Sequence, residues 1–257
     1  MKLHRPPILM YHSIADLADD PNMLCTSPQR FAAQMLYLKQ RGLRGVSVRE
    51  LRRAMNSGVR KGFVGLTFDD GYKDFLSTAV PILERLGFSA TVFAVAGMLG
   101  EENDWEHTYT PRPHLKLLTA EELRVVAERG MEVGSHSTTH PRLTKLEPER
   151  LDQETDKSRR VLSEILGEEV EGFCYPYGSL DGPVLSSVSR AGYAYACAWN
   201  TRVKRNAFDL PRIPISNKDS SVKFAAKLRV YPQYARAKKV ISTPYRALTW
   251  QLRGQGL

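Results

Sequence analysis

Short apolar runs alternate with amphipathic stretches along the first 217 residues of the chain. The apolar runs predict buried strands, and the amphipathic stretches predict helices. We expect strands at 7–11, 63–68, 90–96, 131–135, 170–175, 193–198 and 213–215, and helices at 27–41, 47–58, 72–86, 119–130, 148–166 and 181–191. This alternation indicates an α/β domain with a mainly parallel sheet and helices outside it. Periodicity alone does not decide between a closed barrel and an open sheet.

Local sequence signals mark the ends of several expected helices. Ser27 followed by Pro28 is typical of a helix start. Ser47 and Thr119 are each followed three residues later by a glutamate, which is the pattern of a capping box. Residues 97–118 contain two prolines and no clear period, so they predict a long loop.

The composition excludes several classes of protein. Hydrophobic residues make up 42% and charged residues 25%, which is ordinary for a globular domain and unlike a disordered chain, a coiled coil or a collagen-like fibre. No stretch approaches the roughly 18 apolar residues of a membrane-spanning helix. Three scattered cysteines form no CxxC pair, so neither a disulfide scaffold nor a cysteine zinc site is expected. Because no signal-peptide core is visible near Met1, we expect a cytoplasmic protein.

The net charge of +9 is concentrated near the C-terminus. From Lys218 onward there are nine lysines and arginines and one acid, Asp219, which gives +8, while the preceding residues carry 28 bases and 27 acids, or +1. We therefore predict a body at 1–217 and a basic extension at 218–257. The extension is interpreted either as a solvated helix packed on the body or as a peripheral patch for anionic lipid or polymer. No nucleic-acid-binding motif is present, so a nucleic-acid partner is not expected.

Two adjacent carboxylates end one of the expected strands. Asp69 and Asp70 follow the apolar run 63–68 and precede Gly71. Adjacent like charges are unfavourable unless something separates their roles, and a metal ion does so when one carboxylate binds it and the other remains a base. The alternative is structural, with one aspartate capping the next helix and the other solvated.

Two further clusters and one histidine lie at the ends of other expected strands. His136 and His140 are four residues apart after the strand 131–135, and a helical turn starting at Thr138 would direct both rings to one point, as a zinc site requires. Residues 173–178 leave a strand through an aromatic proline-glycine turn, which can aim a backbone N–H at an oxyanion. His12 follows the first strand, at the same rim of a parallel barrel, and is a candidate proton donor. Surface histidines in a polar loop and a plain aromatic turn are the structural alternatives.

Together, the motifs resemble those of the polysaccharide deacetylase family, also called the NodB-homology domain or carbohydrate esterase family 4. Residues 67–71 look like its first motif, residues 136–140 like its second and residues 175–178 like its third, and the resemblance runs from about residue 7 to about residue 217. It implies a distorted (β/α)7 barrel that removes acetyl groups from an N-acetylated sugar in a metal-dependent reaction.

The resemblance also implies roles for individual residues. Asp69 would be the general base. Three residues would bind one divalent metal ion: Asp70, His136 and His140. Zn²⁺ is expected first, with Co²⁺, Ni²⁺ and Mn²⁺ as alternatives. The backbone N–H of Tyr177 would stabilise the oxyanion, and Tyr177 and Pro176 would contact the substrate.

The sequence departs from the family pattern at two places. Cys174 stands where the family often has an arginine that orients the base, and we expect Arg212 to supply that charge from a later strand. No histidine follows His140, so the late leucine-x-histidine motif is absent. Tyr11-His12 instead resembles the permuted branch, whose acid histidine lies on the N-terminal strand and which includes poly-β-1,6-N-acetylglucosamine deacetylases. His12 would then be the acid.

Two other functions remain open at this point. One is hydrolysis of a non-polymer amide or acetylated small molecule at the same site. The other is a catalytically inactive barrel that binds carbohydrate.

Overall fold

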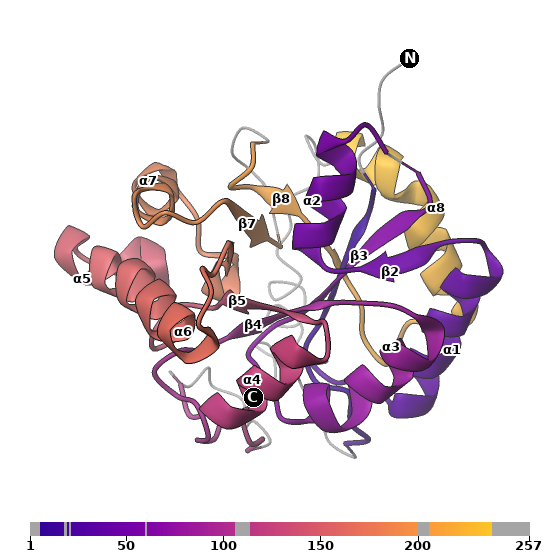
Figure 1. The fold of residues 1–257 in the computed structure, drawn as a ribbon. Coiled ribbons are helices and arrows are strands. Elements are labelled where there is room, and N and C mark those ends of the chain that lie inside the picture. The colour runs from indigo at the N-terminus through magenta and orange to yellow at the C-terminus, as the bar shows by residue number, and fades with distance from the viewer. Residues whose placement is uncertain are drawn as a thin grey trace, which may run out of the picture.

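A parallel sheet forms the centre of the described chain. The computed structural model describes residues 6–17, 20, 22–59, 61–105, 114–199 and 206–237, with side chains as far as Arg229. Within these residues a nine-stranded sheet runs in the order β8-β7-β6-β5-β4-β3-β1-β9, with β2 paired to β3. Every strand pair is parallel, and the helices lie around the outside (Figure 1). The expected parallel α/β architecture is confirmed.

Most strands coincide with the apolar runs. Their bounds are β1 (Ile8–Tyr11), β2 (Arg44–Val46), β3 (Phe63–Phe68), β4 (Thr91–Ala94), β5 (Glu132–Ser135), β6 (Gly172–Cys174), β7 (Tyr195–Ala198), β8 (Leu210–Pro211) and β9 (Ile213–Pro214). Strands β2 and β8 were not expected, because two or three residues are too few to show a period.

The helices surround this sheet. The α-helices are α1 (Pro28–Gln40), α2 (Val48–Asn56), α3 (Val80–Leu86), α4 (Ala120–Glu128), α5 (Pro148–Asp152), α6 (Ser158–Leu166), α7 (Gly182–Arg190) and α8 (Ser221–Ala237). Shorter turns are the π-helical η1 (Phe75–Ala79) and η3 (Gln153–Lys157) and the 3-10 segments η2 (Leu143–Lys145) and η4 (Pro176–Gly178).

One short segment closes the ring of strands. β8 pairs with β7, with Leu210 opposite Cys197. β9 begins only two residues after β8 ends and pairs with β1, with Ile213 opposite Leu9. β8 and β9 are the two ends of one segment, 210–214. If this segment is counted as one strand, it closes a ring of seven with β1, β3, β4, β5, β6 and β7. This is the distorted (β/α)7 barrel that the resemblance implied, with Arg212 at its seam.

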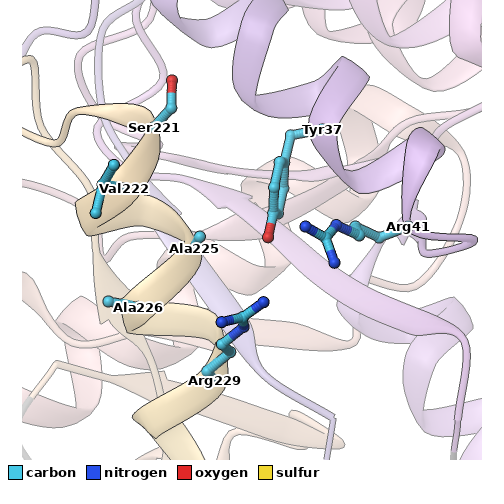
Figure 2. Close-up of a pocket in the computed structure, with 7 residues that line it drawn as sticks. All are labelled: Tyr37, Arg41, Ser221, Val222, Ala225, Ala226 and Arg229. Carbon is cyan, nitrogen blue, oxygen red and sulfur yellow. The ribbon is translucent and has the colours of Figure 1, made fainter.

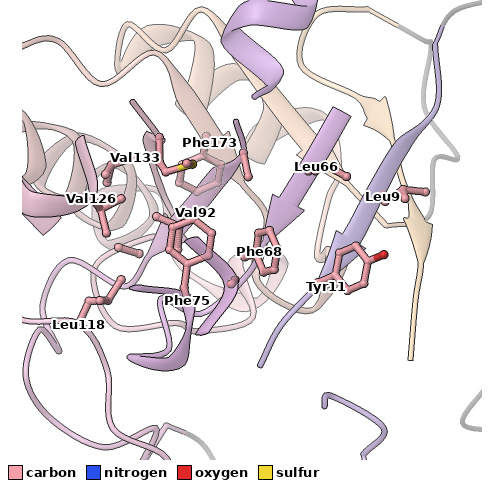
Figure 3. Close-up of a cluster of buried hydrophobic side chains, with 14 of the residues drawn as sticks. Leu9, Tyr11, Leu66, Phe68, Phe75, Val92, Leu118, Val126, Val133 and Phe173 are labelled. Carbon is pink, nitrogen blue, oxygen red and sulfur yellow. The ribbon is translucent and has the colours of Figure 1, made fainter. Parts of the chain in front are cut away.

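Alternate strand residues face the helices and the barrel interior, as the two-residue period of a strand requires. Phe68 and Phe173 face outward and belong to the large apolar cluster of Figure 3. Cys174 faces inward and belongs to a separate cluster. Gly172 leaves room for an inward tyrosine, since a Cβ there would lie 2.3 Å from the hydroxyl of Tyr195. Side chains therefore fill the interior of the barrel.

A buried carboxylate anchors the N-terminal end of the barrel. Glu132 accepts hydrogen bonds from the hydroxyls of Thr91 (2.6 Å) and Tyr195 (2.8 Å) and from the backbone N–H of Arg49 (2.9 Å). Burial raises the pKa of Glu132, although these hydrogen bonds favour its charged form. The start of α2 is thereby fastened to the sheet, and the other end of the barrel is left for the site.

Two expected helices differ from their predicted form. The helix expected at 72–86 begins at Phe75, because Tyr72 pairs with Leu117 and the N–H of Lys73 donates to the carbonyl of Lys116 (2.9 Å). The helix expected at 148–166 is continuous, but η3 inserts a π-helical turn. Such turns are frequent at functional sites.

One of the two expected capping boxes forms completely. The N–H of Glu122 donates to the Thr119 hydroxyl (3.2 Å), and the N–H of Thr119 donates to the Glu122 carboxylate (3.0 Å). At the other, Ser47 accepts from the N–H of Glu50 (3.1 Å), but the Glu50 carboxylate accepts from the Ser89 hydroxyl (2.8 Å). The helix start is capped, but the reciprocal half is replaced by a link to Ser89, which precedes β4.

The described start of the basic extension packs on the barrel. Phe224 of α8 is buried and meets the ring of Tyr37 on α1 at a centroid distance of 5.9 Å. Lys227 donates to the carbonyl of Pro214 and pairs with Asp219, both at 2.7 Å. The domain division at residue 217 stays a prediction, and residues 238–257 lie outside the described chain. No helix among the described residues is long and apolar enough to cross a membrane.

The packing of α1 gives a direct test of the core. Phe31 is fully buried, and its ring lies 5.2 Å from that of Tyr11 and 5.7 Å from that of Phe68. Phe31→Ala removes both contacts and should lower the free energy of unfolding by about 3–5 kcal/mol. Leu36→Ala on the same helix, at a side chain 47% exposed, should change it by less than about 0.5 kcal/mol. Chemical denaturation followed by circular dichroism measures both, and equal losses would contradict this packing.

Candidate active site

Polar residues gather at the C-terminal ends of the barrel strands. Asp69 and Asp70 follow β3, His136 follows β5, His12 follows β1 and Arg212 lies between β8 and β9. The C-terminal ends of parallel barrel strands meet at one rim, which is where such barrels place their active sites. The structure therefore brings most of the predicted site residues together.

Left-handed backbone is concentrated at this rim. Five described residues other than glycine have positive φ, and four of them lie in the site: Asp70 (75°), Ser137 (68°), His140 (60°) and Tyr177 (58°). Non-glycine residues in this region are strained, and such strain clusters at active sites and ligand clamps. The surrounding contacts hold the chain in conformations that a freely folding loop would avoid.

The expectation of a helical turn starting at Thr138 is wrong, because these left-handed conformations take its place. Thr138 and Thr139 form a bend instead. The N–H of His140 donates to the Ser137 hydroxyl (3.0 Å) and the N–H of Ser137 donates to the Ser135 hydroxyl (3.2 Å). The positive φ angles at Ser137 and His140 turn the second histidine back toward the first.

Asp70, His136 and His140 form a compact, buried group. Oδ1 of Asp70 lies 3.3 Å from Nε2 of His136 and 3.4 Å from Nε2 of His140. Ligands placed about 2.0–2.1 Å from a tetrahedral zinc ion lie about 3.3 Å from one another. The spacing of these three residues therefore fits a single ion.

The His136 ring is fixed from its other side. Nδ1 lies 2.8 Å from the carbonyl oxygen of Cys174, and because a carbonyl only accepts, Nδ1 donates and Nε2 faces Asp70. Such a hydrogen bond commonly orients a metal-binding histidine. Burial alone would lower the pKa of His136, but Cys174 and Asp70 raise it well above its ordinary value. A metal ion bound here would displace the His136 proton.

Asp69 faces an arginine instead of the histidine pair. Arg212 places Nη1 2.5 Å from Oδ1 and Nη2 2.7 Å from Oδ2, and both residues are 4% exposed. Burial alone would raise the pKa of Asp69, but the charge and hydrogen bonds of Arg212 lower it. Burial alone would also raise the pKa of Asp70, but hydrogen bonds from both histidines hold it well below its ordinary value. The adjacent carboxylates therefore have separate partners.

The charges and the donor set fit a divalent cation. Asp69 and Asp70 together with Arg212 leave one negative charge to be balanced. Two histidines and one carboxylate leave a fourth position open for water, as catalytic zinc sites do. A second group, Asp69, His136 and Cys174, also has ligand atoms within 4.8 Å of one another. Arg212 donates to both Asp69 and Cys174, and its charge disfavours a metal ion between them.

Glu154 supports the histidine loop and was missed by the sequence reasoning. Its carboxylate accepts from the N–H of Thr138 (2.9 Å), the N–H of Thr139 (2.8 Å) and the hydroxyl of Thr139 (2.7 Å). Glu154 is 1% exposed and lies in η3. In the sequence, Glu154 resembles any glutamate of an exposed helix face. Its supporting role is visible only in the structure, where η3 packs against the histidine loop.

His12 lies close to Asp69, the candidate base. Its Nε2 lies 4.0 Å from Oδ2 of Asp69, and its side chain is 18% exposed. Asp74, which precedes η1, accepts from the Ser13 hydroxyl (2.6 Å) and from the N–H of Ile14 (2.8 Å). Asp74 therefore fixes the segment that follows His12 and is another supporting residue that the sequence did not reveal.

Two aromatic rings enclose His140. The Trp105 ring lies 4.4 Å and the Tyr177 ring 4.7 Å from it, as centroid distances. The guanidinium of Arg142 lies 4.3 Å from the centre of the Tyr177 ring. Tyr177 belongs to η4, the proline-glycine turn of the third motif, and Pro176 is buried there. The motif is thus placed directly against the candidate metal ligands.

Comparison with known proteins agrees with this geometry. A family model described as polysaccharide deacetylase matches residues 56–196. The Bacillus subtilis (strain 168) protein YxkH is 28% identical over 189 residues, which are 73% of this chain and 62% of that protein. A poly-β-1,6-N-acetyl-D-glucosamine N-deacetylase of Staphylococcus aureus is 24% identical over 204 residues, 74% of this chain and 68% of its own. The chain therefore spans about two thirds of these relatives.

Solved structures share the fold over nearly the whole described barrel. The Streptococcus pyogenes deacetylase PplD, solved in complex with acetate, has a TM-score of 0.75 and 25% identity, covering 87% of this chain and 98% of that one. IcaB from Ammonifex degensii has a TM-score of 0.71 and 22% identity, with 88% and 97% covered. At 22% identity, the second likeness shows a shared fold and no more.

Removal of one candidate ligand tests the metal site. His140→Ala should lower the affinity for Zn²⁺ by at least about 10-fold, because one of three protein ligands is lost. His114→Ala is the matched control, since the His114 side chain is 66% exposed and pairs with Glu102. Isothermal titration of both metal-depleted variants with Zn²⁺ measures the affinity and the stoichiometry. Wild-type affinity in His140→Ala would show that the ion is held elsewhere.

Proposed function

The chain belongs to the polysaccharide deacetylase family, and we propose that it hydrolyses the N-acetyl group of an N-acetylated sugar or polysaccharide in a metal-dependent reaction. One observation carries the proposal. Two adjacent carboxylates are separated into a metal-facing group, Asp70 with His136 and His140, and an arginine-bound group, Asp69 with Arg212. A metal-assisted hydrolase needs this division between ligand and base.

The cofactor of the proposed reaction is one divalent ion, with Zn²⁺ first. Asp70, His136 and His140 would hold it, and it would supply positive charge that polarises the acetamide carbonyl and makes water more acidic. The two-histidine, one-carboxylate donor set suits zinc, and Co²⁺, Ni²⁺ and Mn²⁺ are the alternatives.

Asp69 is proposed as the general base. Its lowered pKa keeps it ionised at neutral pH, and it takes a proton from the water that attacks the acetamide carbon. Arg212 holds both carboxylate oxygens and so fixes their direction. The backbone N–H of Tyr177, a residue with left-handed φ in η4, donates to the oxygen on which negative charge develops.

His12 is proposed as the acid that completes the reaction. It gives a proton to the departing amine nitrogen, so that water and the amide become acetate and a free amine. Its ring lies 4.0 Å from Asp69, which places a proton donor and a proton acceptor side by side at the same rim. Tyr177 and Pro176 are the proposed substrate contacts.

The substrate is proposed to be a polymer of N-acetylglucosamine, and the matched Staphylococcus aureus relative, a poly-β-1,6-N-acetyl-D-glucosamine N-deacetylase, favours the β-1,6 linkage. A smaller acetylated molecule is the second candidate. The part of the 97–118 loop that would distinguish a groove from a closed pocket, residues 106–113, lies outside the described chain.

Replacement of the base tests the reaction. Asp69→Asn should lower acetate release from N-acetylglucosamine oligomers of β-1,4 and β-1,6 linkage by at least about 10²-fold, while bound Zn²⁺ stays at the wild-type level. Asp156→Asn, an exposed aspartate on η3 paired with Arg160, is the control and should keep full activity. Acetate is measured enzymatically with and without a chelator. Near-wild-type turnover in Asp69→Asn would refute the assignment of the base.

A membrane contact through the basic extension is a separate part of the proposal. Figure 2 shows Arg41, the C-cap residue of α1, and Arg229 of α8 directed toward the same groove, beside Tyr37. Within the described residues neither arginine makes an ion pair, and Arg41 lies over the Tyr37 ring at 5.1 Å. Two like charges in a groove of about 440 Å³ favour a shared anion.

The apolar wall of the groove favours a lipid over a free polyanion. Val222, which is 79% exposed, lines the same groove as the two arginines, and Ala225 and Ala226 complete the wall. Cations next to exposed apolar side chains are typical of surfaces that rest on anionic bilayers. We propose that this face attaches the protein reversibly to the cytoplasmic side of a membrane. The three free cysteines, all buried, suit a reducing compartment.

Vesicle binding tests the groove. Each basic residue near an anionic bilayer contributes about 1 kcal/mol, so the double variant Arg41→Ala/Arg229→Ala should bind phosphatidylglycerol-containing vesicles about 30-fold more weakly than wild type. Arg53→Ala/Arg160→Ala removes the same charge from α2 and α6, at side chains 73% and 70% exposed, and should bind like wild type. Cosedimentation measures both. Equal loss in the two variants would mean that net charge alone attracts the protein.

A further inference from the structure

Cys174 occupies a junction between the two halves of the site. It is the last residue of β6 and is fully buried. Its backbone carbonyl accepts from Nδ1 of His136 at 2.8 Å. Its Sγ accepts from Nη2 of Arg212 at 3.0 Å. The backbone of this one residue thus contacts a candidate metal ligand, and its side chain contacts the arginine that holds the candidate base.

The hydrogen bonds of Arg212 show what the thiol contributes. Each terminal nitrogen donates once to Asp69. The second hydrogen of Nη1 goes to the hydroxyl of Thr67 (3.1 Å), and the second hydrogen of Nη2 goes to Cys174. The Nε–H has no hydrogen-bond partner among the described residues. Thr67 and Cys174 therefore flank the guanidinium and are its lateral acceptors.

Lateral acceptors matter because a guanidinium can approach a carboxylate in several ways. With acceptors on both flanks, the plane of the fork is fixed, and the two oxygens of Asp69 are held in one direction. With one flank removed, a buried N–H of Nη2 loses its partner, and the arginine is driven to rotate toward another acceptor. The carboxylate would turn with it.

The barrel provides a near-identical residue that lacks this contact. Cys197 on β7 lies directly opposite Cys174 in the parallel register. It is also fully buried and belongs to the same interior cluster. The hydrogen bonds of Arg212 go to Cys174 and not to Cys197. The two thiols therefore share chemistry, depth and strand position, but only the Cys174 thiol accepts from Arg212 and lies within 4.8 Å of ligand atoms of Asp69 and His136.

We propose that the Cys174 side chain is a positioning residue, whose Sγ orients Arg212 so that Arg212 presents Asp69 to the attacking water. The inference rests on the proposed deacetylase function, since it assigns a residue to that same site. It also accounts for a cysteine at the position where the resemblance leads one to expect an arginine. With the arginine supplied from the closing segment 210–214, a small acceptor is what the β6 position must provide.

The experiment compares Cys174→Val with Cys197→Val in the metal-loaded protein. Valine fills a similar volume and accepts no hydrogen bond. Cys174→Val should lower kcat for the N-acetylglucosamine oligomer about 10- to 100-fold, as loss of a supporting contact typically does, with KM and bound Zn²⁺ unchanged. Cys197→Val should match wild type in all three. Cys174→Ser, whose hydroxyl restores the acceptor, should recover most of kcat.

The outcomes are distinguishable. Equal kcat in the two valine variants, or a serine variant as slow as the valine variant, would overturn the proposal. If Cys174→Val does not fold, Cys174→Ala takes its place and should show the same loss. If wild type itself releases no acetate, the proposed function fails, and crystal structures of the two valine variants decide the positioning role. An Arg212–Asp69 pair displaced only in Cys174→Val supports it, and a pair unchanged in both overturns it.

Discussion

The buried pair of Arg212 and Asp69 is the interaction on which the rest of the site depends. A guanidinium and a carboxylate taken out of water are expensive unless their hydrogen bonds are well satisfied. Here the carboxylate receives two bonds from the arginine, and the arginine is flanked by Thr67 and Cys174. The pair also neutralises one of two adjacent aspartates, which leaves Asp70 to the histidines. Without it, two carboxylates side by side would compete for the same cation.

The position of that pair follows from how the barrel closes. Arg212 lies between β8, which joins β7, and β9, which joins β1, so it reaches the interior only when the first and last long strands are brought together. The other supports act from outside the ring. Glu154 fixes the histidine loop from a π turn, and Asp74 fixes the segment after His12. The site is therefore complete only in the closed barrel, whose contacts also hold the left-handed residues at the rim.

Local pattern predicts the elements and the motif residues but not their supports. Strand β3 coincides with its apolar run, and Asp69, Asp70 and His136 were found because each directly follows such a run. The sequence pattern predicts the wrong backbone conformation for the histidine loop, because positive φ at Ser137 and His140 depends on contacts with distant residues. Glu154 and Cys174 carry no local signal, since their roles arise only when η3 and β6 meet the loop and the closing segment. Arg212 was expected from the resemblance, whereas its flanking contacts required the structure.

We propose that Asp70, His136 and His140 bind the metal ion while Arg212 holds Asp69 apart from it. Anomalous diffraction at the zinc absorption edge, on crystals of the zinc-loaded protein, tests this most directly. We expect one strong peak within reach of the Asp70 carboxylate and of Nε2 of both histidines, with Asp69 still paired to Arg212. A peak ligated by Asp69, or an ion placed away from the histidine pair, would contradict it.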